Sequence, residues 1–294
     1  MYNLYDRFST KYKRSKKKQK KRIKVKMSPS IVKNLGSGAN GSVFLMQENG
    51  EHFVRKMFMK QVSLVNEISI YEKLKNVNGV LQMKRFSYKV DARYYGYIDF
   101  EYFEDARSVD EYYSYLSEEE IIDISIQVSR TLNEIHELNI VHRDIKTENV
   151  LYDITSKKAF VIDWDCSVSS EDVIEPTEYF GTLCVNPVEF FTTKRYNDSK
   201  KIDVWQFGAF LFDMLKDSGN GVLFECDEDI HPCQDQEFLD NIRTFNWNAD
   251  VIENTKILYL LEKIFKPEHL RISMYEVNEF LEDMGKQVNA RKSY

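Results

Sequence analysis

The residues that point most directly to chemistry form the segment His142-Arg143-Asp144-Ile145-Lys146-Thr147-Glu148-Asn149, which is followed by Val161-Ile162-Asp163. Phosphoryl transfer needs a carboxylate to accept the proton of the attacking hydroxyl, a cation near the migrating phosphate, and oxygen ligands for magnesium. Asp144, Lys146, Asn149 and Asp163 supply these groups in that order along the chain. The spacing is highly specific and predicts a site for phosphoryl transfer.

A glycine-rich segment nearer the N-terminus could bind phosphate. Gly36, Gly38 and Gly41 lie with Ser37 and Val43 in a turn between two predicted strands, where backbone amides can approach phosphate oxygens closely. An ordinary glycine-rich hairpin fits the same residues. A dinucleotide-binding turn is disfavoured, because a strand and not a helix follows.

Lys56 stands among strand-forming apolar residues in Phe53-Val54-Arg55-Lys56-Met57. A buried ammonium needs an anion, which phosphate oxygens and a carboxylate on a helix could supply. Glu67 is the candidate for that carboxylate. The competing interpretation is an ordinary surface lysine.

The surrounding sequence predicts an α+β protein, with strands first and helices afterwards. Alternating apolar residues favour strands at Ile31–Leu35, Ser42–Met46, His52–Phe58, Val80–Val90 and Tyr94–Tyr102, with a helix over Val65–Leu74. Helical spacing begins after Tyr102, with Ser117 and Glu120 placed as a capping box. Further helices are expected over Phe207–Met214 and Ile257–Ile264.

Composition sets the broad class. The chain has 294 residues, 43% of them hydrophobic, which is enough to bury a substantial core. Four irregularly spaced cysteines give no disulfide framework, and the sequence shows neither a signal peptide nor an apolar run long enough to span a membrane, so we expect a soluble, intracellular protein with no membrane contact. Cys226, His231 and Cys233 lack a fourth ligand for a zinc site.

Charge is distributed very unevenly. Twelve of the 41 Lys and Arg residues lie in residues 1–26 with one acidic residue, so the remaining chain has 29 basic against 46 acidic side chains. The segment from residue 11 to 26 is expected to be a disordered basic tail. It could contact nucleic acid non-specifically, act as a nuclear import signal, fold back on the acidic body, or simply be solvated.

Taken together, these motifs resemble those of the eukaryotic-type protein kinases over roughly residues 31–284. Gly181-Thr182, Pro187-Val188-Glu189, Asp203-Val204-Trp205-Gln206-Phe207-Gly208 and Arg271 follow in the order of that family. The resemblance implies a bilobal fold, with a small β-rich lobe over about 27–101, a hinge over 101–105 and a larger helical lobe over 106–284. A basic tail, 1–26, would precede this domain and a C-terminal tail, 285–294, would follow it.

The resemblance also implies roles for single residues, with ATP and Mg²⁺ as cofactors. Asp144 would be the catalytic base and Lys146 would contact the γ-phosphate, a lysine that is typical of Ser/Thr kinases. Asn149 and Asp163 would bind Mg²⁺. The ATP-binding set would comprise Gly36, Ser37, Gly38, Gly41, Val43, Lys56, Glu67, Glu101 and Phe103, with Phe100 as gatekeeper.

Three features depart from the family pattern. The metal motif reads Asp163-Trp164-Asp165 where the family has Asp-Phe-Gly, and the aspartate removes backbone freedom. Lys56 and Glu67 are closer in sequence than usual, so Glu72 is the alternative partner. Arg143, which phosphothreonine holds in related kinases, would instead find a permanent anion in Glu178, unless Thr177 or Thr182 is phosphorylated.

The substrate is expected to be a basic protein. In basophilic kinases three acidic positions receive substrate arginines, and these positions are Glu111, Glu148 and Asp213 here. The acidic body would also attract a cationic substrate, although such a surface can serve solubility alone. The alternatives to an active Ser/Thr kinase are a pseudokinase scaffold and a nucleic-acid-binding protein.

Compactness, composition and the basic-substrate signature resemble kinases of large DNA viruses, in particular the late protein kinases of insect baculoviruses. That likeness implies an arginine-rich, DNA-packaging substrate and a host-cell nuclear location.

Overall fold

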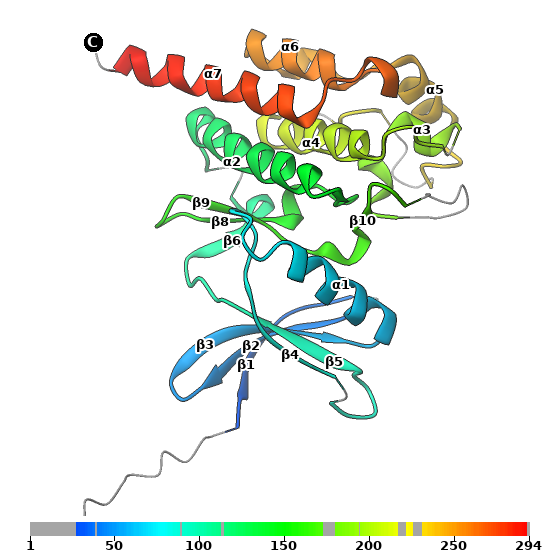
Figure 1. The fold of residues 1–294 in the computed structure, drawn as a ribbon. Coiled ribbons are helices and arrows are strands. Elements are labelled where there is room, and N and C mark those ends of the chain that lie inside the picture. The colour runs from blue at the N-terminus through cyan, green and yellow to red at the C-terminus, as the bar shows by residue number, and fades with distance from the viewer. Residues whose placement is uncertain are drawn as a thin grey trace, which may run out of the picture.

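The computed structural model has a small lobe built on one sheet and a larger, mostly helical lobe (Figure 1). The predicted α+β class with this division is confirmed. The structure describes residues 28–292, apart from 39, 89, 113–114, 173–179, 194, 217–221 and 226–230. The predicted basic tail, Glu178, Thr177 and Cys226 therefore lie outside the described residues.

The small lobe is a five-stranded antiparallel sheet in the order β1-β2-β3-β5-β4, with one helix against it. Its elements are β1 (Ser30–Ser37), β2 (Gly41–Glu48), β3 (Glu51–Phe58), α1 (Gln61–Lys73), β4 (Met83–Tyr88) and β5 (Gly96–Phe100). Helix α1 buries Leu64, Ile68 and Tyr71. Gly96 permits this packing, because a Cβ there would lie 2.5 Å from Leu64 Cδ2.

Two predicted strands are shorter than expected. Strand β5 covers only Gly96–Phe100 of the predicted Tyr94–Tyr102, and β4 starts late because the residues before it belong to the contact between the lobes. Strand β4 begins at Met83 and not at Val80. Val80 instead forms an isolated parallel bridge with Val161, whose amide donates to Gly79 O at 2.8 Å. Apolar alternation cannot separate the two arrangements, since both bury Val80.

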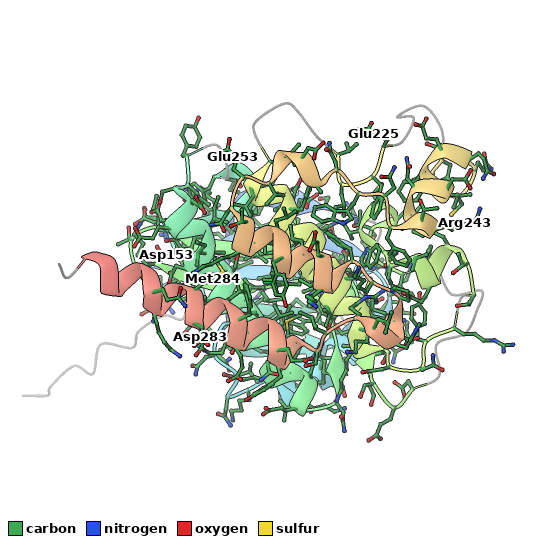
Figure 2. All side chains as sticks on the ribbon, turned by 90° about the horizontal axis from the view of Figure 1, so that it is seen from above. Asp153, Glu225, Arg243, Glu253, Asp283 and Met284 are labelled. Carbon is green, nitrogen blue, oxygen red and sulfur yellow. The ribbon has the colours of Figure 1, made fainter. Side chains whose placement is uncertain are left out.

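The larger lobe is organised around helix α4 (Lys200–Leu215), which is buried along almost its whole length. Helices α2 (Glu118–Glu137), α6 (Thr255–Ile264) and α7 (Met274–Lys292) pack on it, and Figure 2 shows α6 and α7 side by side on top. The remaining elements are β6 (Ala106–Ser108), β7 (Ile140–Val141), β8 (Val150–Asp153), β9 (Lys158–Val161), β10 (Val168–Ser169), α3 (Val188–Phe191) and α5 (Gln236–Thr244). Strands β6, β8 and β9 form one small sheet, and β7 pairs with β10.

Two helix ends test the sequence analysis. The capping box at the start of α2 is confirmed, because Glu120 N donates to Ser117 Oγ at 3.3 Å and Ser117 N donates to Glu120 Oε2 at 3.1 Å. The predicted domain boundary at residue 284 falls inside α7 and stays a prediction. Helix α7 continues to Lys292, beyond its buried Leu281 and Met284. None of the described helices is long and apolar enough to cross a membrane.

Candidate active site

A cleft of about 520 Å³ lies between the lobes and collects most of the residues predicted to bind nucleotide. Apolar side chains of both lobes line it, together with Lys56 and several carboxylates. The predicted residues that line it are Gly36, Val43, Lys56, Glu67, Phe100, Glu101, Phe103, Glu111, Glu148, Asn149 and Asp163. A cavity of this size with few, convergent polar groups is typical of a small-molecule site.

Ser37, Gly38 and Gly41 shape the glycine-rich turn and do not line the cleft. Gly38 N donates to Gly41 O at 2.9 Å, which closes the turn. Gly41 must be glycine, because a Cβ there would lie 1.8 Å from Met57 O on the neighbouring strand. The strand pair β2–β3 places Val43 opposite Lys56 and so brings the turn next to the lysine.

Lys56 is held by three carboxyl groups. Its Nζ lies 2.7 Å from Glu67 Oε2, 2.9 Å from Asp163 Oδ1 and 3.0 Å from Asp165 Oδ1. Glu67 is therefore the helix partner in the structure, whereas Glu72, the alternative, is exposed on α1. Asp165 lies in the short turn Trp164–Cys166 with negative φ, so aspartate fits there without the strain that would require glycine.

The close packing of charges shifts the pKa values of Lys56, Glu67 and Asp165. Burial opposes the charged form of Lys56, but the carboxylates outweigh it and raise the pKa of Lys56 well above its usual value. Burial raises the pKa of Glu67 well above its usual range. Burial would also raise that of Asp165, yet hydrogen bonds with Glu67, Lys56 and Asn40 and the charge of Lys56 lower the pKa to about 2.

Asp144 lies in the loop between β7 and β8, with both carboxylate oxygens fixed. Its Oδ1 accepts from Thr182 N at 2.8 Å and its Oδ2 from Asn149 Nδ2 at 2.9 Å. Lys146 Nζ is 3.6 Å from the same Oδ2 and donates to Thr182 Oγ1 at 2.6 Å. Thr182 thus holds both residues, a role that the sequence analysis missed when it considered Thr182 only as a phosphorylation site.

Helix α4 supplies the side chains that shape this loop. Asp203 is fully buried and its carboxylate accepts from His142 N at 2.9 Å and from Arg143 N at 2.8 Å. Gln206 Oε1 accepts from Ile145 N at 3.0 Å. The sequence motif identified this helix, but the function of its polar residues became visible only in the structure.

The predicted metal ligands have suitable chemistry. Asn149 uses its amide nitrogen for Asp144, so its amide oxygen is the atom that it could offer to Mg²⁺. Asp163 has φ of 63°, and its side chain is 44% exposed to the cleft. Among the described residues, the only group of metal-ligating side chains that gathers is Glu67, Asp163 and Asp165, with one oxygen of each within 4.8 Å of the others. Lys56 Nζ already contacts all three of these residues, and of the three only Asp163 is also a predicted magnesium ligand.

The chain segment around Glu189, which follows the metal motif in sequence, is anchored by a buried ion pair. Arg271 Nη2 lies 2.9 Å from Glu189 Oε2, which confirms the contact that the motif order implied. Arg143 Nε donates to Cys166 O at 2.6 Å, and its guanidinium lies over the Phe180 ring. Glu178, the predicted permanent partner of Arg143, lies outside the described residues.

The three acidic residues predicted to select arginine differ in their surroundings. Glu111 and Glu148 are exposed at the cleft. Asp213 lies nearby, since Thr147 Oγ1 is 3.3 Å from Glu148 Oε2 and 3.0 Å from Asp213 Oδ2. Lys216 Nζ lies 2.5 Å from Asp213 Oδ1, so a substrate arginine would compete with that lysine.

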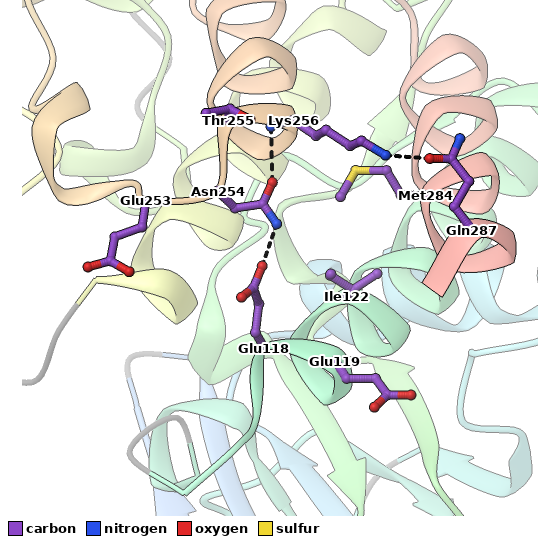
Figure 3. A pocket seen from close by; sticks show the side chains of 9 residues that line it. All are labelled: Glu118, Glu119, Ile122, Glu253, Asn254, Thr255, Lys256, Met284 and Gln287. Atoms are coloured by element: carbon purple, nitrogen blue, oxygen red, sulfur yellow. Dashed lines mark hydrogen bonds between the residues drawn. The ribbon is translucent and has the colours of Figure 1, made fainter. Parts of the chain in front are cut away.

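A second hollow, of about 470 Å³, lies where α2, α6 and α7 meet (Figure 3). Its polar side chains already contact one another: Asn254 donates to Glu118, and Lys256 donates to Gln287. None of the residues singled out from the sequence lines it. The cleft between the lobes is therefore the better candidate for catalysis.

Comparison with known proteins agrees with this geometry. The family model described as "Protein kinase domain" matches residues 30–284. The chain is 26% identical over 205 residues to ribosomal protein S6 kinase alpha-4 of Mus musculus, which is 63% of this chain and 26% of that protein. It is 27% identical over 212 residues to the serine/threonine-protein kinase US3 homolog of equine herpesvirus 1 (strain Ab4p), covering 68% and 51%. With Aurora kinase of Dictyostelium discoideum the identity is 28% over 199 residues, covering 63% and 49%. The chain thus spans about a quarter to a half of the length of these relatives.

Proposed function

Since this chain belongs to the protein kinase family, we propose that it transfers the γ-phosphoryl group of ATP to a Ser or Thr hydroxyl of a basic protein, with preference for sites that carry arginine. The observation that carries the proposal is the arrangement around Asp144. Its carboxylate is fixed by Thr182 N and Asn149, with Lys146 beside it.

Each residue has a physical task in this reaction. Asp144 accepts the proton of the attacking hydroxyl, and its two fixed oxygens prevent it from rotating away. Lys146 faces the charge that develops on the migrating phosphoryl group, and Lys56 binds the phosphates that remain. Asn149 and Asp163 would hold Mg²⁺, which neutralises phosphate charge. No predicted catalytic residue is missing, which argues against a pseudokinase.

The decisive experiment is turnover of Mg-ATP on an arginine-rich protein, with Asp144→Asn as the inactive control. Phosphoserine or phosphothreonine formed by the wild type and not by the variant is the expected result. If the purified wild type transfers no phosphate to any basic protein, the scaffold alternative replaces the enzyme.

Arginine selection rests on the exposed carboxylates at the cleft. A charge-assisted contact with arginine contributes about 1.5 to 3 kcal/mol when it is shielded from water, and less when exposed. Glu148→Ala should therefore raise KM for an arginine-containing peptide about fivefold and leave a neutral peptide unaffected. Asp213→Ala should have a smaller effect, because Lys216 already pairs with Asp213. Glu137→Ala removes an exposed acidic residue of α2 and serves as the matched control. Equal losses on both peptides would refute selection.

The remaining part of the proposal concerns the cellular location of the protein and its physiological substrate. The US3 relative is a viral kinase, and a late kinase of the insect baculovirus type would act on an arginine-rich, DNA-packaging protein in the host-cell nucleus. Residues 11–26 would support import or bind nucleic acid non-specifically. Deleting residues 1–26 should abolish nuclear accumulation or salt-sensitive DNA binding, and an unchanged variant would refute both roles.

A further inference from the structure

We infer that Asp165 is a positioning residue that joins the glycine-rich turn to Lys56 and thereby strengthens the binding of ATP phosphates. The inference rests on the proposed function. It assigns a role to the aspartate that replaces the glycine of the family motif, and to Asn40 at the tip of the turn.

The geometry gives each oxygen of Asp165 its own donor. Lys56 Nζ lies 3.0 Å from Oδ1, and Asn40 Nδ2 donates to Oδ2 at 3.1 Å. The side chain of Asp165 is only 12% exposed, so both contacts are largely shielded from water. Asn40 and Asp165 are separated by 125 residues along the chain, so their contact ties the small lobe to the metal motif.

The backbone of Asn40 holds the glycine-rich turn against the sheet. Asn40 O accepts from Met59 N at 3.0 Å, just beyond the end of β3. Gly41 meanwhile approaches Met57 O as closely as only glycine can. The turn is therefore held on the sheet side by its backbone, and the Asn40 side chain reaches across to Asp165.

Charge explains why the contact affects nucleotide binding. A carboxylate near a triphosphate would repel it unless donors neutralise that carboxylate. Lys56 and Asn40 supply those donors for Asp165, and Asp165 in turn keeps Lys56 oriented toward the cleft. If either donor is removed, a negative charge remains close to the phosphates. Asn40 therefore lessens the repulsion between Asp165 and the ATP phosphates.

The test is a double-mutant cycle on nucleotide affinity, measured by calorimetry with Mg-ADP and supported by steady-state kinetics. Asn40→Ala and Asp165→Ala should each weaken binding about fivefold, and the double variant should be no weaker than the weaker single variant. The KM for ATP should rise with kcat almost unchanged. Gln47→Ala, an exposed change on β2, is the control and should leave affinity unaltered.

A swap of the two groups separates this contact from general damage to the fold. Asn40→Asp alone places two carboxylates face to face and should weaken binding more than Asn40→Ala. Combining it with Asp165→Asn restores a donor–acceptor pair, and affinity should return to within about twofold of wild type.

Additive losses in the cycle, or tighter binding in Asp165→Ala, would overturn the inference. Tighter binding would show that Asp165 competes with the phosphates for Lys56. A wild-type protein that binds no nucleotide would instead refute the proposed function.

Discussion

Thr182 offers the sharpest test of the catalytic geometry, because its backbone and its side chain serve different residues. The amide fixes Asp144, and the hydroxyl accepts from Lys146 Nζ at 2.6 Å. Thr182→Val keeps the shape and the amide but removes the hydroxyl. Thr182→Ser keeps both polar groups and is the matched control.

The expected magnitude follows from the surroundings of Lys146. A hydrogen bond to a charged group contributes about 1.5 to 3 kcal/mol. The Lys146 side chain is 22% exposed and also faces Asp144, so the lower end applies. A loss of about 1.4 kcal/mol in the transition state corresponds to about a tenfold lower kcat.

Steady-state kinetics with saturating peptide would measure this change, and KM for ATP should move less than about twofold. Mass spectrometry of the purified protein should accompany the assay, since phosphate on Thr182 would change the meaning of both variants. If Thr182→Val and Thr182→Ser have the same kcat, the hydroxyl does not position Lys146 and the reasoning fails.

Three other perturbations test separate parts of the structure. Asp144→Asn should lower kcat at least about 10³-fold, because an amide cannot accept the proton of the attacking hydroxyl, and activity near wild type would contradict the assignment. The protein should remain folded, because the amide oxygen can still accept from Thr182 N, although the bond from Asn149 Nδ2 is lost. Asp99→Asn should destabilise the small lobe by about 3 kcal/mol in urea unfolding, since the buried Asp99 accepts from Arg55 at 2.6 Å and from Arg85 at 2.6 Å; a loss below about 1 kcal/mol would count against it. Burial raises the pKa of Glu67 in the folded protein, so the wild type loses stability as the pH rises from the pKa of Glu67 in the unfolded chain toward its pKa in the folded protein. The Tm of Glu67→Gln relative to wild type should therefore increase between pH 5 and pH 8. A constant difference in Tm would refute this.

Local sequence patterns predicted the parts of the fold that depend on periodicity. Alternation gave the strands that carry Lys56, and the capping residues gave the start of α2. The carboxylate partner of Lys56 does not follow from sequence distance alone, because both Glu67 and Glu72 are compatible with it. The structure resolves it through the start of α1 at Gln61, which places Glu67 on the same buried face as Leu64 and Tyr71.

The parts that sequence reasoning missed are polar contacts between distant segments. From the sequence, Asp165 indicates only lost backbone freedom, whereas in the structure its carboxylate accepts from Lys56 and Asn40. Asp203 and Gln206 were recognised as members of a helix motif, but a motif does not say which amides they cap. Such contacts have no period, and each depends on how the lobes and loops meet in space.

The hydrogen bonds from Asp203 and Gln206 have a consequence for amide exchange with solvent. The amides of His142, Arg143 and Ile145 lie outside any helix, and β7 ends at Val141. Their acceptors are buried side chains of α4. An amide exchanges only when its acceptor separates from it, and here that requires fully buried side chains of the central helix to leave their places. The catalytic loop should therefore exchange its amide hydrogens as slowly as core helices do, although by backbone conformation it is a loop.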